Sequence, residues 1–325
     1  MRSDAHPIRT SALALFIRLG VALFLTFGAN ASYSEGGLFG KDRAARQLQE
    51  ETLDYHGDER SYLIYVPPNY RPEAATPLVL VLHGGFGNAE MMVDITGFDE
   101  LAEKRNFVVV YPNGSGRRFG EHYTWNAGNC CGYAQEKGVD DVGFIKALLD
   151  RLESRFNIDR KRVYATGVSN GGMLAYRLAC EIPERFAAIA PVAATLAVER
   201  CNPDELIPIL HIHGTGDENV PYTGGRGSNT KTRGVEHRSV PDTLRIMRTL
   251  HQCSGQDKQR MLNADVEEDI PSCRRGGPVD LVLIKGGGHT WPGRQDEPKE
   301  KIFDGGISAS KLILQFFALH PRDGR

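Results

Sequence analysis

Short apolar runs alternate with amphipathic stretches through most of the chain. Residues 77–82 (PLVLVL) and 107–111 (FVVVY) are continuously apolar, as expected of strands buried on both faces. Seven runs are predicted as strands: residues 61–66, 77–82, 107–111, 162–166, 187–192, 207–212 and 279–284. The clearest helical pattern between them places five apolar side chains on one face: Ile145, Leu148, Leu149, Leu152 and Phe156. This alternation predicts an α/β fold, with a mostly parallel sheet covered by helices on both faces.

Two segments depart from this rhythm. Residues 123–138 are rich in Gly, Asn, Cys and aromatic side chains and are predicted to form a shaped loop. Residues 223–239 have no apolar period and are predicted as a surface excursion, after which Ser239 caps a helix. The last helix is predicted at residues 311–319, capped by Ser308 or Ser310.

The first 31 residues have the character of a signal peptide. Three arginines precede an apolar run at residues 19–27, and Ala29-Asn30-Ala31 is a small-x-small cleavage site. The apolar run is too short to span a bilayer, so we expect no stable membrane anchor. The sequence therefore predicts a signal peptide at residues 1–31, one domain at residues 32–325, and a secreted or periplasmic protein.

Charge and length limit the class of protein further. Removing residues 1–31, which hold three Arg and one Asp, leaves 36 basic and 40 acidic residues and changes the net charge from −2 to −4. This near balance gives no electrostatic signature of a nucleic-acid partner. A mature chain of about 290 residues suits one large α/β domain that buries a full core.

The six cysteines favour disulfides over metal binding. An even number in an exported chain is typical of disulfides, and the spacing matches no zinc motif, so no metal is expected. We expect Cys253 to pair with Cys273. The adjacent cysteines at positions 130 and 131 are expected to pair with Cys180 and Cys201.

Ser169 is the candidate nucleophile. It is the serine of a Gly-x-Ser-x-Gly motif that follows a predicted strand and precedes a helical pattern, the context of a nucleophile elbow. Gly167 and Gly171 allow the close backbone approach that this turn requires. The helix N-terminus beyond the serine favours developing negative charge. The alternative, a chance match, is weakened by this context.

A nucleophilic serine needs a base and an orienting acid. Asp217 follows the predicted strand at residues 207–212, and His289 follows the last predicted strand within a run of glycines. Strand ends at this edge hold the sites of open α/β sheets, and the chain order Ser, Asp, His is that of α/β-hydrolases. His289 is the candidate general base for Ser169, and Asp217 would orient its imidazole.

Both assignments have alternatives. Asp217 could be a turn former beside a glycine, with Glu218 or Asp204 as the acid. His289 could be a hydrogen-bonded structural histidine. Three other histidines lie within or beside core strands and are interpreted as packing residues: His83, His211 and His213.

The segment from His83 to Asn88 (HGGFGN) is the candidate oxyanion loop. It follows a buried strand, where lipases and esterases place an HGGG-type loop. The backbone N–H of Gly85 or Phe86, together with that of Asn170, would bind the substrate carbonyl oxygen. A phosphate-binding turn is the alternative, but no Lys-Ser/Thr follows the glycines.

The two tryptophans, Trp125 and Trp291, lie in loops at predicted site positions. Each could stack on an aromatic acyl group or line a groove for a polymer, or could instead anchor its loop. Asp140 and Asp141 are assigned to a helix N-terminus rather than to the reaction.

Six sequence blocks together resemble the esterase family that groups extracellular polyhydroxybutyrate depolymerase-like proteins with LpqC-like feruloyl esterases. The resemblance implies an α/β-hydrolase fold, no cofactor, and Ser169, Asp217 and His289 as the catalytic triad. The family often has a third consecutive glycine at the position of Phe86. The blocks lie at residues 82–88, 125–132, 139–144, 164–172, 211–217 and 287–293.

These observations predict a secreted serine esterase that acts through an acyl-enzyme. The expected substrates are esters of biopolymers or their oligomers: polysaccharide-linked feruloyl or acetyl groups, or polyhydroxyalkanoate oligomers. The alternatives are an acyltransferase on the same fold and a non-catalytic, polymer-binding hydrolase-like protein.

Overall fold

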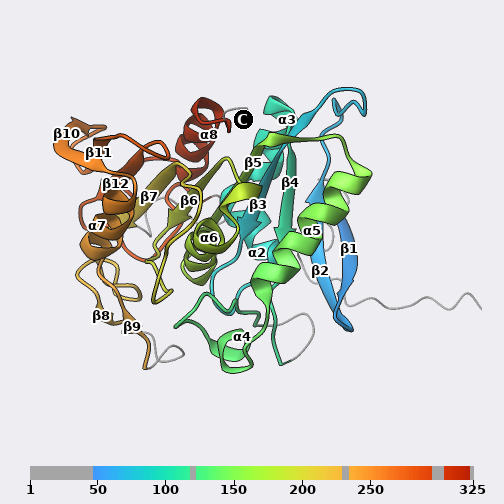
Figure 1. The fold of residues 1–325 in the computed structure, drawn as a ribbon, viewed down its shortest axis with the longest axis horizontal. Coiled ribbons are helices and arrows are strands. Elements are labelled where there is room, and N and C mark those ends of the chain that lie inside the picture. The colour runs from blue at the N-terminus through green and yellow to red at the C-terminus, as the bar shows by residue number, and fades with distance from the viewer. Residues whose placement is uncertain (1–46, 118–121, 229–233, 295–303, 323–325) are drawn as a thin grey trace, which may run out of the picture. The chain divides into compact units, whose positions relative to one another are not determined.

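A ten-stranded sheet forms the centre of the protein in this computed structural model (Figure 1). The structure describes residues 47–117, 122–228, 234–294 and 304–322. All of these belong to one unit of the chain, Leu38–Arg325. The predicted signal peptide at residues 1–31 lies outside the described residues, so its cleavage stays a prediction.

Six parallel strands form the middle of the sheet, and an antiparallel pair extends it at each edge. In order, the parallel strands are β4 (Val108–Pro112), β3 (Thr76–Leu82), β5 (Ile158–Val168), β6 (Ala188–Val192), β7 (Ile209–Gly214) and β12 (Val279–Ile284). One edge carries β2 (Asp58–Tyr65) and β1 (Gln49–Tyr55), and the other carries β11 (Val266–Cys273) and β10 (Cys253–Met261).

All seven predicted strands fall on observed ones, and the predicted α/β fold is confirmed. The sequence did not predict β1, β10 and β11. These strands lie at or next to the edges of the sheet, and sequences such as QEETLDY carry no continuous apolar signal. Hydrogen bonds to neighbouring strands hold these strands in the sheet. They need not be buried on both faces, so no continuous apolar run marks them in the sequence.

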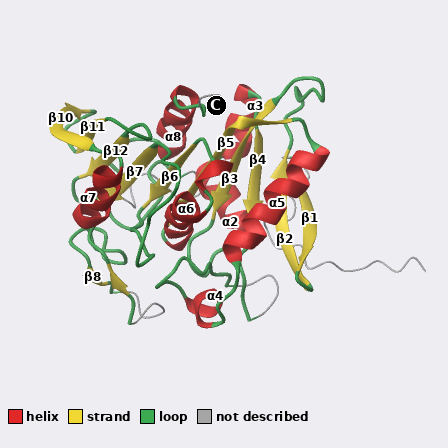
Figure 2. Cartoon of the chain, viewed as in Figure 1, coloured by secondary structure: helices red, strands yellow, loops and turns green. Residues whose placement is uncertain are grey.

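Helices cover both faces of the sheet (Figure 2). Side chains that alternate along the strands divide into two cores. The first core includes residues from α5 (Asp141–Arg155), α6 (Asn170–Glu181) and α7 (Val240–Leu250). The second includes residues from α2 (Ala89–Thr96), α3 (Phe98–Arg105) and α8 (Ala309–Leu319).

Side chains that were predicted at helix N-termini cap α5, α7 and α8. Ser239 caps α7, and Ser308, rather than Ser310, caps α8 by accepting the N–H of Lys311. Asp140 caps α5 by accepting the N–H of Gly143 at 2.9 Å, which agrees with its assignment to a helix N-terminus.

The remaining short elements belong to the loops around the strand ends. The predicted loop at residues 123–138 includes a short helix, α4 (Gly132–Glu136), and η1 (Pro183–Arg185) is a single 3-10 turn. The predicted surface excursion contains a small antiparallel pair, β8 (Gly225–Arg226) and β9 (Glu236–His237). Within the described residues, no helix is both long and apolar enough to cross a membrane.

The disulfide pairing differs in part from the prediction. Cys253 pairs with Cys273 as expected, across neighbouring positions of β10 and β11. The prediction for the other four cysteines is wrong, because Cys180 pairs with Cys201 and the two adjacent cysteines, Cys130 and Cys131, pair with each other. Sequence spacing does not reveal which cysteines the fold brings close together.

Asp280 makes the stability of this fold depend on pH. Its side chain is buried on β12, and one carboxylate oxygen accepts no hydrogen bond from the described residues. Burial raises the pKa of Asp280 to about 7, from an ordinary value of 3.8. The neutral form is thus favoured in the folded protein, so this group lowers stability as the pH rises from about 4 through about 7.

We therefore expect Asp280→Asn to be more stable than the natural protein at pH 8, by about 2–4 kcal/mol, and nearly equal to it at pH 4.5. Urea denaturation of both proteins at the two pH values measures this difference. A stability difference that is the same at both pH values would show that Asp280 is not protonated by burial.

Candidate active site

Ser169 lies at the turn between β5 and α6, in a conformation that side chains rarely adopt. Its φ is 55° and its ψ is −123°, which costs about 1–3 kcal/mol and persists only where the surroundings hold it. Its N–H donates to the carbonyl of Val192 at 2.9 Å. A Cβ at Gly167 or at Gly171 would collide with the backbone of Leu82, so only glycine fits on either side of the serine.

Asp217 and His289 meet at the ends of two neighbouring strands. β7 and β12 pair in parallel, so the loops that follow them leave the same edge of the sheet. His289 Nδ1 lies 2.8 Å from Asp217 Oδ2. The other oxygen, Oδ1, accepts the N–H groups of Asn219 and Val220 at 2.9 and 2.8 Å. These bonds compensate for burying the carboxylate, which has no exposed side-chain surface.

The alternative acids do not take this position. Glu218 and Asp204 are both exposed, whereas Asp217 is buried against His289. The structure therefore brings His289 together with Asp217.

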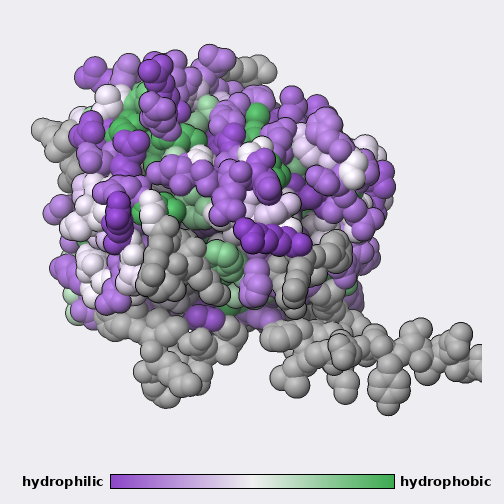
Figure 3. Space-filling view, turned by 90° about the horizontal axis from the view of Figure 1, so that it is seen from below, coloured by the Kyte–Doolittle hydropathy of each residue, from purple (hydrophilic) through white to green (hydrophobic). Residues whose placement is uncertain are grey.

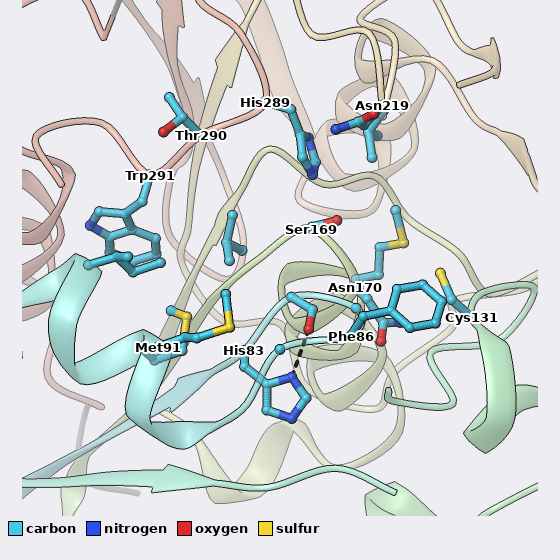
Figure 4. Close-up of a pocket in the computed structure, with 18 of the residues that line it drawn as sticks. His83, Phe86, Met91, Cys131, Ser169, Asn170, Asn219, His289, Thr290 and Trp291 are labelled. Carbon is cyan, nitrogen blue, oxygen red and sulfur yellow. Dashed lines mark hydrogen bonds between the residues drawn. The ribbon is translucent and has the colours of Figure 1, made fainter. Parts of the chain in front are cut away.

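Ser169 and His289 line one cavity of about 210 Å³ (Figure 4). The imidazole of His289 points towards Ser169, and the turn that carries Phe86 lies on the opposite side of the serine. Apolar side chains make up much of the wall, including Met91, Met92 and Ile95. On the face of the molecule seen in Figure 3, several small apolar areas lie among mostly hydrophilic side chains.

Among the predicted oxyanion donors, Phe86 is ruled out by its own hydrogen bond. Phe86 has a φ of 65°, and its N–H donates to the carbonyl of Tyr123 at 2.7 Å. The sequence could not reveal this, because Tyr123 belongs to a different loop. Gly85 and Asn170 both line the cavity, and neither N–H is donated to an acceptor among the described residues.

Trp125 does not line the cavity, so its prediction as a substrate-binding residue is wrong. It is completely buried, its Nε1 donates to the carbonyl of His83 at 2.9 Å, and its ring stacks on His83. The side chain of Asn170 holds its backbone at both N–H and carbonyl, at 2.7 and 2.9 Å. Trp125 therefore anchors its loop between the oxyanion loop and α6.

Trp291 is also an anchor, although it reaches the cavity. Its ring packs edge-to-face on Phe98, and its Nε1 donates to Ser310 Oγ at 3.0 Å. Only 2 % of the residue is exposed, so it contributes part of the cavity wall rather than an open platform.

A chain of buried hydrogen bonds lies behind Asp217. Tyr176 Oη lies 2.8 Å from His211 Nδ1, and His211 Nε2 lies 3.2 Å from His213 Nδ1. His213 Nε2 lies 3.0 Å from the carbonyl of Val220 and 3.5 Å from Asp217 Oδ2. Burial lowers the pKa of both histidines, so both rings are neutral at pH 7.

The direction of each hydrogen bond in this series is determined by its last acceptor, the carbonyl of Val220. The carbonyl of Val220 can only accept, so His213 carries its proton on Nε2. His213 Nδ1 must then accept from His211 Nε2, and His211 Nδ1 accepts the hydroxyl of Tyr176. The sequence indicated two packing histidines but not their link to Asp217. The available signal was the His-x-His spacing, which places both rings on one face of β7.

The described residues contain no group of three or more His, Cys, Asp or Glu side chains placed to hold a metal ion. Several residues that line the cavity were not predicted from the sequence. These include His237, from the excursion with no apolar period, and the paired cysteines 130 and 131.

Comparison with known proteins agrees with the fold and identifies the family. The family model "Esterase PHB depolymerase" matches residues 60–201. Feruloyl esterase B of Piromyces equi is 28 % identical over 71 % of this chain and 42 % of its own length. The putative esterase NocK of Nocardia uniformis is 30 % identical over 73 % of this chain and 72 % of its own. An S-formylglutathione hydrolase from Agrobacterium tumefaciens shares the fold, with a TM-score of 0.55 at 13 % identity over 84 % of this chain and 95 % of that one.

The protein has the α/β-hydrolase fold, and its candidate site lies at the ends of the parallel strands. The chain belongs to the polyhydroxybutyrate depolymerase and feruloyl esterase family. It spans less than half the length of the feruloyl esterase B that it matches.

If Trp125 is an anchor, Trp125→Phe should act on stability. The substitution leaves the buried carbonyl of His83 without its donor, which we expect to cost about 1–3 kcal/mol of unfolding free energy. Urea denaturation measures the loss. Trp291→Phe is the matched comparison, because it removes the hydrogen bond that Trp291 Nε1 donates to Ser310 Oγ. An unchanged stability would contradict the anchoring role of this hydrogen bond.

Proposed function

We propose that the protein is a serine carboxylic-ester hydrolase in which Ser169, His289 and Asp217 act as the catalytic triad. The observation that carries this proposal is the hydrogen bond between His289 Nδ1 and the buried Asp217, with His289 and Ser169 on one cavity. A bond through Nδ1 leaves Nε2 of the imidazole to face the serine, which is the arrangement required of a general base.

The reaction would proceed through an acyl-enzyme. His289 takes the proton of Ser169 while Oγ attacks the ester carbonyl, and Asp217 stabilises the imidazolium that forms. The imidazolium then gives this proton to the leaving alcohol oxygen, and an ester bond to Ser169 remains. Water, activated by His289, hydrolyses that ester in the second half of the reaction and releases the acid.

The N–H groups of Gly85 and Asn170 are the proposed oxyanion donors. Asn170 is the first residue of α6, where an N–H has no partner within the helix and the helix dipole favours negative charge. Gly85 follows β3 and lies beside Asn170, since a Cβ at Gly85 would stand 3.6 Å from Asn170 Cβ. Donors preorganised in this way stabilise the charge that develops on the carbonyl oxygen.

The proposed substrates are esters of biopolymers or of their soluble oligomers. The similarity to a feruloyl esterase favours feruloyl groups on polysaccharide, and the family favours short polyhydroxyalkanoates. A cavity of about 210 Å³ with apolar walls suits a single acyl group rather than a polymer chain. We also propose that residues 1–31 are a signal peptide and that residues 32–325 act as one secreted domain.

The test is acid release from methyl ferulate, an acetylated xylo-oligosaccharide and a 3-hydroxybutyrate oligomer, measured side by side. We expect at least one to be hydrolysed, and Ser169→Ala and Asp217→Asn to lower kcat by on the order of 10⁴-fold. Glu218→Gln, at an exposed carboxylate beside Asp217, should leave kcat unchanged.

Two outcomes would overturn the assignment. Acyl transfer to an added alcohol in preference to water would identify an acyltransferase. Activity that survives Ser169→Ala would remove the serine mechanism and favour a non-catalytic role for this site.

The chain of hydrogen bonds behind Asp217 gives a separate prediction. His213→Ala removes the ring that holds the Val220 carbonyl and lies beside Asp217, so the acid loses part of its support. We expect kcat to fall on the order of ten- to hundredfold with little change in KM, because misplacing a catalytic group acts on the transition state. Tyr176→Phe, which alters only the far end of the chain, should have a smaller effect. Equal effects of the two variants would contradict a specific role of His213 at Asp217.

A further inference from the structure

The two proposed oxyanion donors belong to distant parts of the chain. Gly85 follows β3 and Asn170 begins α6, yet a Cβ at Gly85 would stand 3.6 Å from Asn170 Cβ. Donors stabilise an oxyanion only when both lie about 2.7–3.1 Å from its position, so small shifts between the two elements reduce their effect. The spacing between these two N–H groups must therefore be fixed by other parts of the protein.

One loop segment contacts both elements. We call this segment, residues 123–131, the brace. Three hydrogen bonds join the brace to the oxyanion loop: Phe86 N–H to the Tyr123 carbonyl at 2.7 Å, Tyr123 N–H to the Gly87 carbonyl at 3.2 Å, and Trp125 Nε1–H to the His83 carbonyl at 2.9 Å. These bonds lie on both sides of Gly85 in the sequence, so they hold the loop before and after the donor.

The peptide group that carries the Gly85 N–H is fixed by the residues that the brace holds. The carbonyl of this peptide belongs to Gly84, and it accepts the N–H of Gly87 at 3.1 Å. His83 Nε2 accepts the N–H of Gly114 at 2.9 Å, so Nδ1 of this ring carries the proton and donates to the Gly84 carbonyl at 2.7 Å. The carbonyl and the N–H of a trans peptide point in opposite directions, so fixing one fixes the other.

The brace holds Asn170 through its side chain. Asn170 Oδ1 accepts the N–H of Trp125 at 2.7 Å, and Asn170 Nδ2 donates to the Trp125 carbonyl at 2.9 Å. Asn170 is only 1 % exposed, so a shift of its amide would leave buried polar groups unpaired. Trp125 therefore contacts His83 through its ring and Asn170 through its backbone, and it links the two donor elements directly.

The Cys130–Cys131 disulfide lies at the end of the brace, next to these bonds. The N–H of Cys131 donates to the same Trp125 carbonyl at 3.1 Å, and Cys130 Sγ lies 3.9 Å from Asn170 Nδ2. Both cysteines line the catalytic cavity together with Asn170, and Cys131 and Asn170 are labelled in Figure 4. The disulfide is thus in contact with the side chain that positions the first residue of α6.

This disulfide is poorly suited to stabilising the fold as a whole. A disulfide acts on the unfolded chain through the loop that it closes, and its effect grows with the length of that loop. Adjacent cysteines close the shortest loop possible, whereas Cys180–Cys201 and Cys253–Cys273 span separations of 21 and 20 residues. The effect of Cys130–Cys131 is therefore expected in the local geometry of the brace.

We propose that the brace is a positioning element of the oxyanion hole, held against α6 by the Asn170 side chain and the Cys130–Cys131 disulfide. It sets the directions of the Gly85 and Asn170 N–H groups, so the disulfide is needed for full activity rather than for folding. This inference rests on the proposed function, because it requires these two N–H groups to be the oxyanion donors.

Two esters of one acid report on the oxyanion hole: 4-nitrophenyl acetate and 4-nitrophenyl thionoacetate. Sulfur is a weak hydrogen-bond acceptor, so the thionoester gains less from the N–H donors than the oxygen ester does. A variant that damages the hole should lower kcat/KM for the oxygen ester more than for the thionoester. A loss of folded enzyme would lower both values equally and leave their ratio unchanged.

Cys130→Ala/Cys131→Ala tests the disulfide. The matched control is Cys253→Ala/Cys273→Ala, at a disulfide between β10 and β11 whose cysteines are not among the described residues that line the cavity. We expect the first variant to lower kcat for the oxygen ester, and the ratio of oxygen ester to thionoester, on the order of tenfold, with little change in Tm. The control should lower Tm and leave kcat and the ratio unchanged. An unchanged ratio in the first variant, or equal changes in both, would overturn the role of the disulfide.

Asn170→Ala tests the side-chain amide, because it keeps the backbone N–H of this residue and removes both bonds to Trp125. We expect kcat for the oxygen ester to fall about 10- to 100-fold with little change in KM, and the ratio of the two esters to fall with it. Circular dichroism checks that the variant is folded. A folded Asn170→Ala protein that keeps the natural ratio would overturn the positioning role of the brace.

The same measurements separate this inference from the proposed function. If Ser169→Ala abolishes hydrolysis while Asn170→Ala and the Cys130→Ala/Cys131→Ala variant keep the natural ratio, the serine esterase stands and the brace is rejected. Hydrolysis that survives Ser169→Ala would overturn the proposed function, and this role of the brace with it.

Discussion

The close packing of two backbone turns is the constraint on which the site depends. The turn from β5 into α6 lies against the end of β3 so tightly that a side chain at Gly167 or Gly171 would collide with the backbone of Leu82. This contact, together with the bond from the Ser169 N–H to Val192, holds the serine in a conformation that it would not adopt alone. The same contact places the candidate oxyanion loop beside Ser169, so one contact both strains the serine and aligns it with that loop.

A second glycine contact assembles the other half of the site. Gly214 at the end of β7 and Gly287 after β12 approach so closely that a Cβ at Gly214 would collide with the backbone of Gly287. The N–H of Gly216 also donates to the Gly287 carbonyl at 2.9 Å. The acid and the histidine are therefore positioned by backbone contact between the two loops. The parallel sheet relates this pair to the nucleophile turn, because all of these loops leave its carboxyl edge.

The features that were predictable are those whose physical cause is local in the sequence. Buried parallel strands require continuous apolar runs, and the tight turn at Ser169 requires glycines, so both leave patterns that can be read directly. Several of the errors concern partners that lie apart in the chain. The Nε1–H of Trp125 donates to the carbonyl of His83, and the N–H of Phe86 donates to the carbonyl of Tyr123. Cys180 forms a disulfide with Cys201. No local pattern specifies such pairs, because the fold alone brings them together.

The electrostatics around Asp217 depend on which groups donate hydrogen bonds to its carboxylate. The carboxylate of Asp217 is buried, yet it accepts two backbone N–H groups and the Nδ1–H of His289, and His213 Nε2 lies 3.5 Å away. Burial keeps His213 neutral, so it supports the carboxylate without cancelling its charge. The negative charge of Asp217 therefore remains available to the one ring that both binds it and faces Ser169. In the proposed reaction, this charge would stabilise the proton that His289 takes from Ser169.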